Sequence, residues 1–148
     1  MKMAALSSAN QSAPARFDAA ILLLRVASAL AFLYHGSSIL FGSFGGPGPQ
    51  HFAASHQWPV GLAYLVGLAQ VGGGLALLTG ILFRIGALCI IAVMLGAIFI
   101  VHLPHGFDVS NGGAEYALTQ FLVAIAFLLT GPGGYSLNSF LPASLKKL

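Results

Sequence analysis

The sequence predicts an all-α integral membrane protein, a four-helix bundle with both termini in the cytoplasm. Of the 148 residues, 57% are hydrophobic and only 6% are charged, and the mean hydropathy is +0.90. Polar groups are therefore too few to cover the surface of a soluble domain. Four apolar runs are also long enough for membrane-spanning helices, which need about 20 residues each. We expect these helices at about 19–41, 59–83, 85–103 and 115–131, with the lipid bilayer around them.

The basic residues indicate how the chain is oriented in the membrane. Six Lys and Arg stand against three acids, which gives a pI of 9.4, and four of the six lie in the terminal tails. Arg84 stands in the short connection between the second and third runs. Because Lys and Arg favour the cytoplasmic side, we expect these parts inside the cell and the loops 42–58 and 104–114 outside. The expected location is the inner (plasma) membrane, crossed several times, and nucleic acid is not an expected partner.

The chain is expected to form one domain between two tails. Residues 1–18 are expected to be a polar cytoplasmic tail, 19–138 the four-helix domain and 139–148 a basic C-terminal tail. The first apolar run is too long for the hydrophobic part of a signal peptide, so we expect it to be retained. Cys89 is the single cysteine, and any dithiol redox chemistry would therefore need a second protein.

The first helix carries two basic side chains on one face. Arg25, Ser28, Phe32, His35 and Ile39 share a stripe at about 100° per residue. A charged side chain in lipid faces the bundle interior or snorkels to the headgroups, and we expect Arg25 to snorkel because its stem is long. His35 lies about 15 Å further along the helix.

The Gly- and Pro-rich segment 42–58 is expected to be an outer loop. Trp58 marks the place where the chain re-enters the membrane, because amphipathic rings favour the interface. His51 and His56 have no metal-ligand spacing around them. We expect both to be solvated or interfacial.

The second helix combines small residues with one amide. Ala63, Gly67, Gln70 and Gly74 share a face, and small residues at this spacing let helix backbones approach closely in lipid. Gln70 lies near mid-membrane, where an amide needs a partner. A hydrogen bond between helices is the expected role of Gln70, and contact with a ligand is the alternative.

Polar residues of the first, third and fourth helices are expected at one depth. His102 lies about 27 Å along its helix from Arg84, and His35 lies about 24 Å along from Ala19. Glu115 begins the fourth helix, where the helix dipole favours a carboxylate. We therefore expect His35, His102 and Glu115 to form an outward-facing pocket, although capping of the helix is a simpler role for Glu115.

No metal site is expected. Pro104 separates His102 from His105 and ends the helix, which spoils the geometry that a helical pair of ligands needs. His105 and Asp108 could hold a metal only in a loop, where both are expected to be solvated.

Five segments follow one another along the chain: RVASALAFLYHGSSILFG, GLAQVGGGLALLTGILFRIGAL, MLGAIFIVHLPHGF, NGGAEYAL and GPGGYSLN. In this order they resemble the DoxX family of small four-helix membrane proteins, from about Leu24 to Asn138. The resemblance implies four transmembrane helices. It also places the family motifs on Arg25, His35, Gly36, Gly72–Gly74, Arg84, His102, Glu115 and Tyr116. Tyr116 therefore joins the candidate pocket.

The resemblance further implies, for some relatives, a role in redox assemblies. These relatives are membrane subunits of thiosulfate:quinone oxidoreductase, or a membrane partner of superoxide dismutase and a sulfurtransferase. Many relatives have a glutamate where this chain has Gln70. An amide keeps the hydrogen bonding but does not titrate, so the difference favours a structural or binding role over catalysis.

The expected function is that of an integral membrane subunit of a redox complex, with a quinone as the candidate ligand. We expect the chain to be a subunit or partner of an oxidoreductase, beside other membrane subunits, rather than an enzyme by itself. One alternative is a non-catalytic accessory subunit that packs its Gly-rich faces against neighbours. Another, less favoured, is a subunit that binds haem or a pigment between His35 and His102, because histidine at a helix end is more often interfacial.

Overall fold

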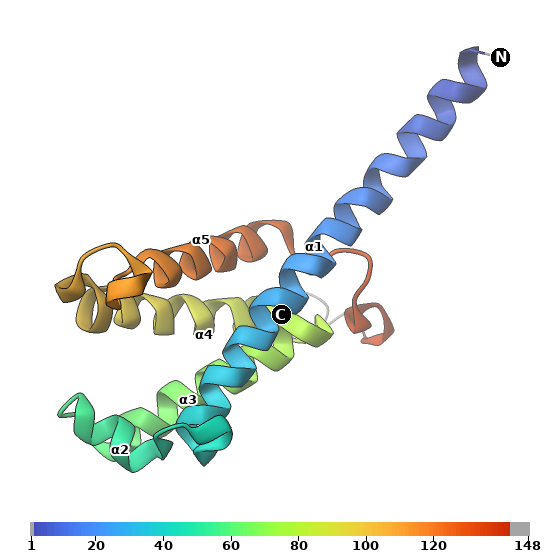
Figure 1. The fold of residues 1–148 in the computed structure, drawn as a ribbon. Coiled ribbons are helices and arrows are strands. Elements are labelled where there is room, and N and C mark those ends of the chain that lie inside the picture. Colours follow the sequence, from blue (N-terminus) through green and yellow to red (C-terminus); the bar gives the residue numbers. More distant parts are fainter. Residues whose placement is uncertain (1, 143–148) are drawn as a thin grey trace.

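The computed structural model describes the backbone of residues 2–142 and the side chains of residues 15–142, and every regular element in that part is a helix. Figure 1 shows the arrangement. The elements are α1 (Lys2–Phe41), α2 (Gly48–Ser55), α3 (Val60–Thr79), α4 (Phe83–Gly96), a π-helix (Ala97–His102) and α5 (Glu115–Thr130). The predicted fold class, an all-α membrane bundle, is confirmed.

Three of the described segments are long and apolar enough to cross a membrane: Ala15–Phe41, Val60–Thr79 and Phe83–His105. The fourth, α5, has 16 residues and is shorter than a usual span. The outer surface of these helices is apolar, because Leu23, Leu65 and Leu129 are each more than 60% exposed. Side chains of this kind point outward where lipid, and not water, is the solvent.

Two element boundaries differ from those expected. Helical backbone in α1 continues back to Lys2, through a segment expected to be a polar tail; its many alanines have high helix propensity. The connection between α3 and α4 is Gly80–Leu82, so that Arg84 lies on the first turn of α4 with an exposed side chain. The segment expected to be an outer loop also contains a short helix, α2.

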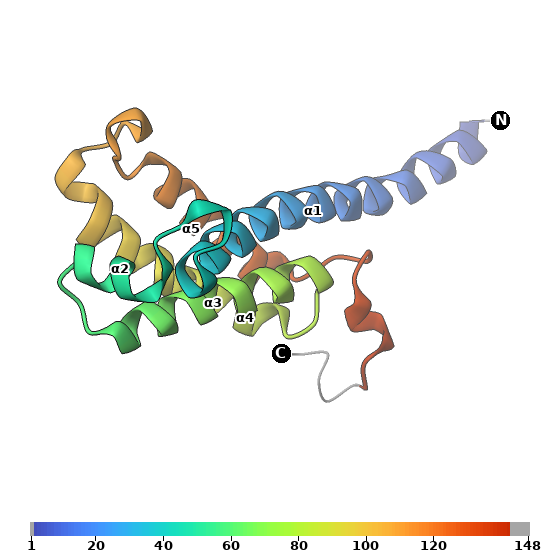
Figure 2. The same cartoon turned by 60° about the horizontal axis from the view of Figure 1, so that its bottom comes forward.

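The helices form a wedge rather than a parallel bundle. Along the chain, α1 packs on α3, α3 on α4 and α4 on α5, while α2 covers α1 and α3. Figures 1 and 2 show α4 and α5 running side by side as one layer, which meets α1 and α3 near the Gly80–Leu82 turn and diverges from them toward the other end. We call the two ends the Arg25 end and the His102 end.

Glycines set the point where the layers meet. A Cβ on Gly73 would lie 2.8 Å from Ile90 Cδ1, and a Cβ on Gly86 would overlap Ala76 Cβ. These distances show that α3 and α4 cross with their backbones close together, as small residues permit in lipid. On the other face of α3, Gly67 packs on Leu40 of α1. Gly74 also lies on this α1–α3 interface.

The main hydrophobic core lies between the layers, around and beyond this crossing. Phe83 and Phe127 meet edge to face with 5.5 Å between ring centroids, and both are almost fully buried. A smaller cluster of Ile39, Ala53 and Ala63 holds α2 against α1 and α3. Side chains thus fill the wedge where the layers are close.

Candidate functional site

Arg25 is buried in the bundle and does not snorkel. Its side chain is 1% exposed. Its Nε donates a hydrogen bond to Leu77 O (2.8 Å), one terminal nitrogen donates to Leu78 O (2.9 Å), and the other donates to Pro132 O (2.7 Å) and Tyr135 O (2.8 Å). The expectation that Arg25 reaches the headgroups is therefore wrong, because carbonyl oxygens inside the protein receive its donors.

The position of these carbonyls explains how a charge can be buried there. Leu77 and Leu78 belong to the last turn of α3, and Pro132 and Tyr135 follow the end of α5 at Thr130. The last carbonyls of a helix lack intrahelical partners and carry the negative end of its dipole. One guanidinium thus satisfies the C-terminal end of α3 and binds the loop that follows α5. Phe83 adds its ring face 5.6 Å away.

Asp18 completes this end of the molecule. Its Oδ1 accepts a hydrogen bond of 2.8 Å from Gly134 N, which holds the GPGG turn after α5 against α1. No salt bridge to Asp18 or Arg25 is present in the part of the chain that the structure describes. Both charged groups bind backbone atoms of other segments and so hold this end of the molecule together. We call these contacts of Asp18 and Arg25 the staple.

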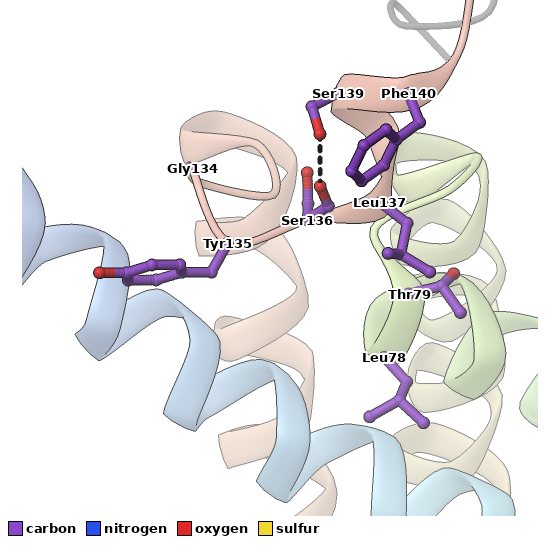
Figure 3. Close-up of a pocket in the computed structure, with 8 residues that line it drawn as sticks. All are labelled: Leu78, Thr79, Gly134, Tyr135, Ser136, Leu137, Ser139 and Phe140. Atoms are coloured by element: carbon purple, nitrogen blue, oxygen red, sulfur yellow. Dashed lines mark hydrogen bonds between the residues drawn. The ribbon is translucent and has the colours of Figure 1, made fainter.

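A shallow cavity of about 500 Å³ lies beside this staple. Figure 3 shows that Leu78 and Thr79 of α3 line one side and residues 134–140 the other, with the Tyr135 ring directed toward α1. Thr79 Oγ1 donates to Leu75 O and Ser139 Oγ donates to Ser136 O. The protons of these two hydroxyl groups are thus already bonded to the protein, and the cavity is open and shallow.

A larger cavity, of about 720 Å³, opens where the layers diverge at the His102 end. Its volume is within the range of ligand-binding pockets, about 300–1,000 Å³. Its walls come from α1 to α5, the π-helix and the loop before α5, and most of them are apolar. The polar side chains on the walls are His35, His56, Gln70, His102 and Tyr116, with the thiol of Cys89.

His102 is held in one orientation on the cavity wall. Its Nδ1 is 2.7 Å from Gly112 O. A carbonyl only accepts, so Nδ1 carries the proton and Nε2 of the neutral ring is left as an acceptor. The ring belongs to the π-helix Ala97–His102, which replaces the last turns of the predicted helix. Such π turns often mark functional sites.

The structure brings three of the four candidate pocket residues together. His35, His102 and Tyr116 all line this cavity, whereas Glu115 does not. Glu115 is exposed on the first turn of α5, where its Oε2 accepts a hydrogen bond of 3.2 Å from Val109 N. Its carboxylate therefore fastens the preceding loop to the helix.

Gln70 lies on the α3 wall of the same cavity and is 6% exposed. Its amide forms no hydrogen bond with any residue that the structure describes, so the expected bond between helices is not made. Close packing fixes the stem, since the Gln70 Cβ lies 2.9 Å from where a Cβ on Gly36 would be. A nearly buried glutamine whose amide has no partner within the described residues thus lines a preformed cavity.

Helix α2 covers the cavity and was not expected from the sequence. His56 stacks between Phe52 and Trp58, with ring centroids 4.6 and 4.8 Å away, and its Nδ1 lies 2.8 Å from Phe52 O. All three rings line the cavity. His56 is half-buried between these rings, so its expected solvated or interfacial position stays a prediction. Pro49 at the helix start and the Phe52–His56 spacing of four residues could have signalled this helix.

The loop outside the cavity carries Asp108, a carboxylate in an exposed turn. Ser110 N and Ser110 Oγ each donate to Asp108 Oδ1 at 2.8 Å. These bonds favour the ionised form and hold the pKa of Asp108 below its usual value. Asp108 orders the loop, and within the described residues no group of three His, Cys, Asp or Glu side chains is placed to hold a metal ion.

Comparisons with known proteins agree with this architecture. A family model described as DoxX matches residues 20–103, which include His35, Gln70 and His102. A protein of Bacillus subtilis (strain 168) with the name "Putative oxidoreductase CatD" is 31% identical over 124 residues, which cover 84% of this chain and 88% of that protein. No solved structure matches the chain. The apolar helical wedge described above thus belongs to a multi-pass membrane protein, and this chain is a member of the DoxX family.

Proposed function

We propose that this protein is the membrane subunit of a redox complex and that the cavity at the His102 end binds a quinone from the bilayer. The main observation that supports this proposal is the cavity itself, an apolar space with a few polar groups on its walls. A quinone has the matching chemistry, an apolar ring and tail with two carbonyl oxygens. The family and the name of the Bacillus subtilis relative support a redox role.

The chain's own residues have distinct tasks in this proposal. The apolar walls of α3 and α4 exclude water from the ring, which strengthens each hydrogen bond formed inside. His102 is oriented by Gly112 O, so that its second nitrogen is available to a hydroxyl group of the reduced ligand. With Cys89 as the single cysteine, the chain has no dithiol of its own, and the electrons come from a partner subunit.

Binding of a decyl-substituted p-benzoquinone to the protein in lipid nanodiscs tests the cavity. Gly96 lines it in a right-handed helical conformation and has no atom within 4 Å of its would-be Cβ, so Gly96→Phe adds a ring to the cavity. We expect this variant to fold and to lose binding by at least about tenfold, a change of about 1.4 kcal/mol.

Gly72→Phe is the matched control. Gly72 is also helical and also has open space around its would-be Cβ, but it does not line the cavity. Equal quinone affinity in both variants and the unmodified protein would remove the cavity from the proposal. Native purification followed by mass spectrometry tests the complex, and recovery of only free copies of this chain would contradict the proposed partner.

We also propose that the protein lies in the plasma membrane of the cell and that its Arg25 end faces the cytoplasm. Exposed Arg16 and Arg84 lie at this end, and basic residues gather on the cytoplasmic side. With Cys89 changed to serine, Ser139→Cys should react only with a membrane-permeant thiol reagent in intact cells. Ser110→Cys should also react with an impermeant one, and the reverse pattern would invert the orientation.

A further inference from the structure

The Gln70 amide stands out among the polar groups of the cavity. The Nδ1 atoms of His56 and His102 are bonded to carbonyls of the protein, whereas the Gln70 amide has no hydrogen-bond partner within the described residues. Gln70 is also 94% buried, since its exposed fraction is 6%. Its amide atoms are not among the fully buried atoms that lack a partner, so they are open to the cavity, and an amide left unpaired in such an apolar space costs about 1–3 kcal/mol. Some compensating interaction is expected where such a group is kept.

The surroundings of Gln70 indicate what kind of partner could supply that interaction. Val66 and Ala69 line the cavity beside it on α3, and Val93 lines it on α4. A polar atom of a ligand that enters this apolar region therefore meets an amide as its neighbour on the α3 wall. An amide offers both a donor N–H₂ and an acceptor oxygen, and it does not titrate.

We propose that Gln70 is a specificity-determining residue of the cavity, which recognises a ring oxygen of the ligand in both of its redox forms. Its N–H₂ donates to the carbonyl oxygen of a quinone, and its Oε1 accepts from the hydroxyl group of the corresponding hydroquinone. This inference rests on the proposed function. It adds the residue that distinguishes an oxygen-bearing ring from a plain hydrocarbon.

Two probes and two variants test this role. The probes are decyl-p-benzoquinone and decylbenzene, which share the tail and ring but differ in the ring oxygens. The variants are Gln70→Met and Gln120→Met. Gln120 is the control for an amide that does not itself line the cavity: it is a partly buried glutamine on α5 whose Oε1 has no hydrogen-bond partner, and its side chain is hydrogen-bonded to Tyr116, so it reports any indirect effect through that wall residue.

We expect Gln70→Met to weaken binding of the quinone about tenfold and to leave decylbenzene binding equal or tighter. Gln120→Met should change neither affinity. Isotope-edited infrared spectra give a second readout: the carbonyl stretch of the bound quinone should move toward its value in hydrocarbon solvent in Gln70→Met and stay unchanged in Gln120→Met.

The outcomes separate this inference from the proposed function. If neither probe binds the unmodified protein, the cavity takes no apolar ligand and both proposals fail. If both probes bind but Gln70→Met keeps the full preference for the quinone and the same carbonyl stretch, the role of Gln70 is refuted and the quinone site stands. An equal loss in Gln120→Met would likewise refute a local role for Gln70, because the effect would then not depend on contact with the ligand.

Discussion

At the Arg25 end a full positive charge is buried with four hydrogen bonds to carbonyls, whereas at the His102 end the amide of Gln70 lines a cavity and has no hydrogen-bond partner among the described residues. Both groups lie inside an apolar bundle, and Arg25 is the more expensive of the two to desolvate. The protein has nevertheless satisfied Arg25 and left Gln70 open. The difference indicates where to look for a ligand. Polar side chains lie inside both ends, but Gln70 lacks a hydrogen-bond partner among the described residues and lies beside a cavity.

The shape of the wedge reinforces this contrast. The layers meet through glycines near the Arg25 end, and the core fills the space around them. They diverge at the other end, where α2 and the π-helix enclose a cavity instead of a packed core. One end therefore has a packed core, and the other has the cavity in which we propose that a ligand binds.

The largest expected effect comes from removing the staple. Arg25→Met should lower the free energy of unfolding in detergent micelles by more than about 3 kcal/mol, because each carbonyl left without a donor costs about 1–3 kcal/mol. Thermal unfolding followed by circular dichroism measures the change. Arg84→Met is the control, since Arg84 is exposed and should change stability by less than about 0.5 kcal/mol. Similar losses in both variants would mean that Arg25 acts only as one more positive charge.

The next effect tests the crossing of α3 and α4. Gly86→Ala should destabilise the protein by about 1–3 kcal/mol, because the new Cβ overlaps Ala76 Cβ on the facing helix. Gly72→Ala adds the same methyl group to open space and should be neutral or stabilising by up to about 1 kcal/mol. Equal melting temperatures for the two variants would show that the helices are free to separate at this crossing.

A smaller effect of opposite sign is expected at the cavity. Gln70→Met removes an amide that has no protein partner within the described chain, so stability without ligand should stay equal or rise by up to about 1 kcal/mol. The same unfolding measurement used for Arg25→Met applies here. A loss of more than 1 kcal/mol would show that the amide supports the fold and would weaken the contrast between the two ends.

The smallest effect concerns the loop. The pKa of Asp108 is lower in the folded protein than in the unfolded chain, so its ionised carboxylate stabilises the loop above the unfolded value and loses this effect as pH falls through the folded value. Asp108→Asn should therefore speed hydrogen exchange of the Gly113 N–H at neutral pH, since that N–H is bonded to Asp108 O. The difference from the unmodified protein should shrink below the usual pKa of aspartate, and a pH-independent difference would contradict this account.

The sequence was sufficient for the fold class and for part of the site. Hydropathy and length predicted the membrane helices, and helical rise predicted a similar depth for His35 and His102, which both line one cavity in the structure. These predictions worked because each depends on one helix at a time.

The remaining features depend on how helices meet, which a single chain does not display. Whether Arg25 snorkels or turns inward is decided by the carbonyls of α3 and of the segment after α5, more than 50 residues away. Likewise, Glu115 looked like a pocket residue by depth, but the loop amide of Val109 takes its carboxylate out of the cavity. Helix α2 is a different case. The proline at its start was a helix signal in the sequence, but the Gly and Pro residues around it suggested a loop.

The π-helix has a consequence for how this site could change over time. A π turn holds one residue more than the α-helical turn it replaces. Deleting one residue within Ala97–His102 would restore the α-helical ladder and leave the directions of the following side chains nearly unchanged, because the wider π turn is what accommodates the extra residue. A deletion within α4, by contrast, would rotate the side chains that follow it by about 100° and take His102 off the cavity wall. The π-helix is therefore a place where a single-codon deletion can leave both the membrane scaffold and the direction of His102 intact.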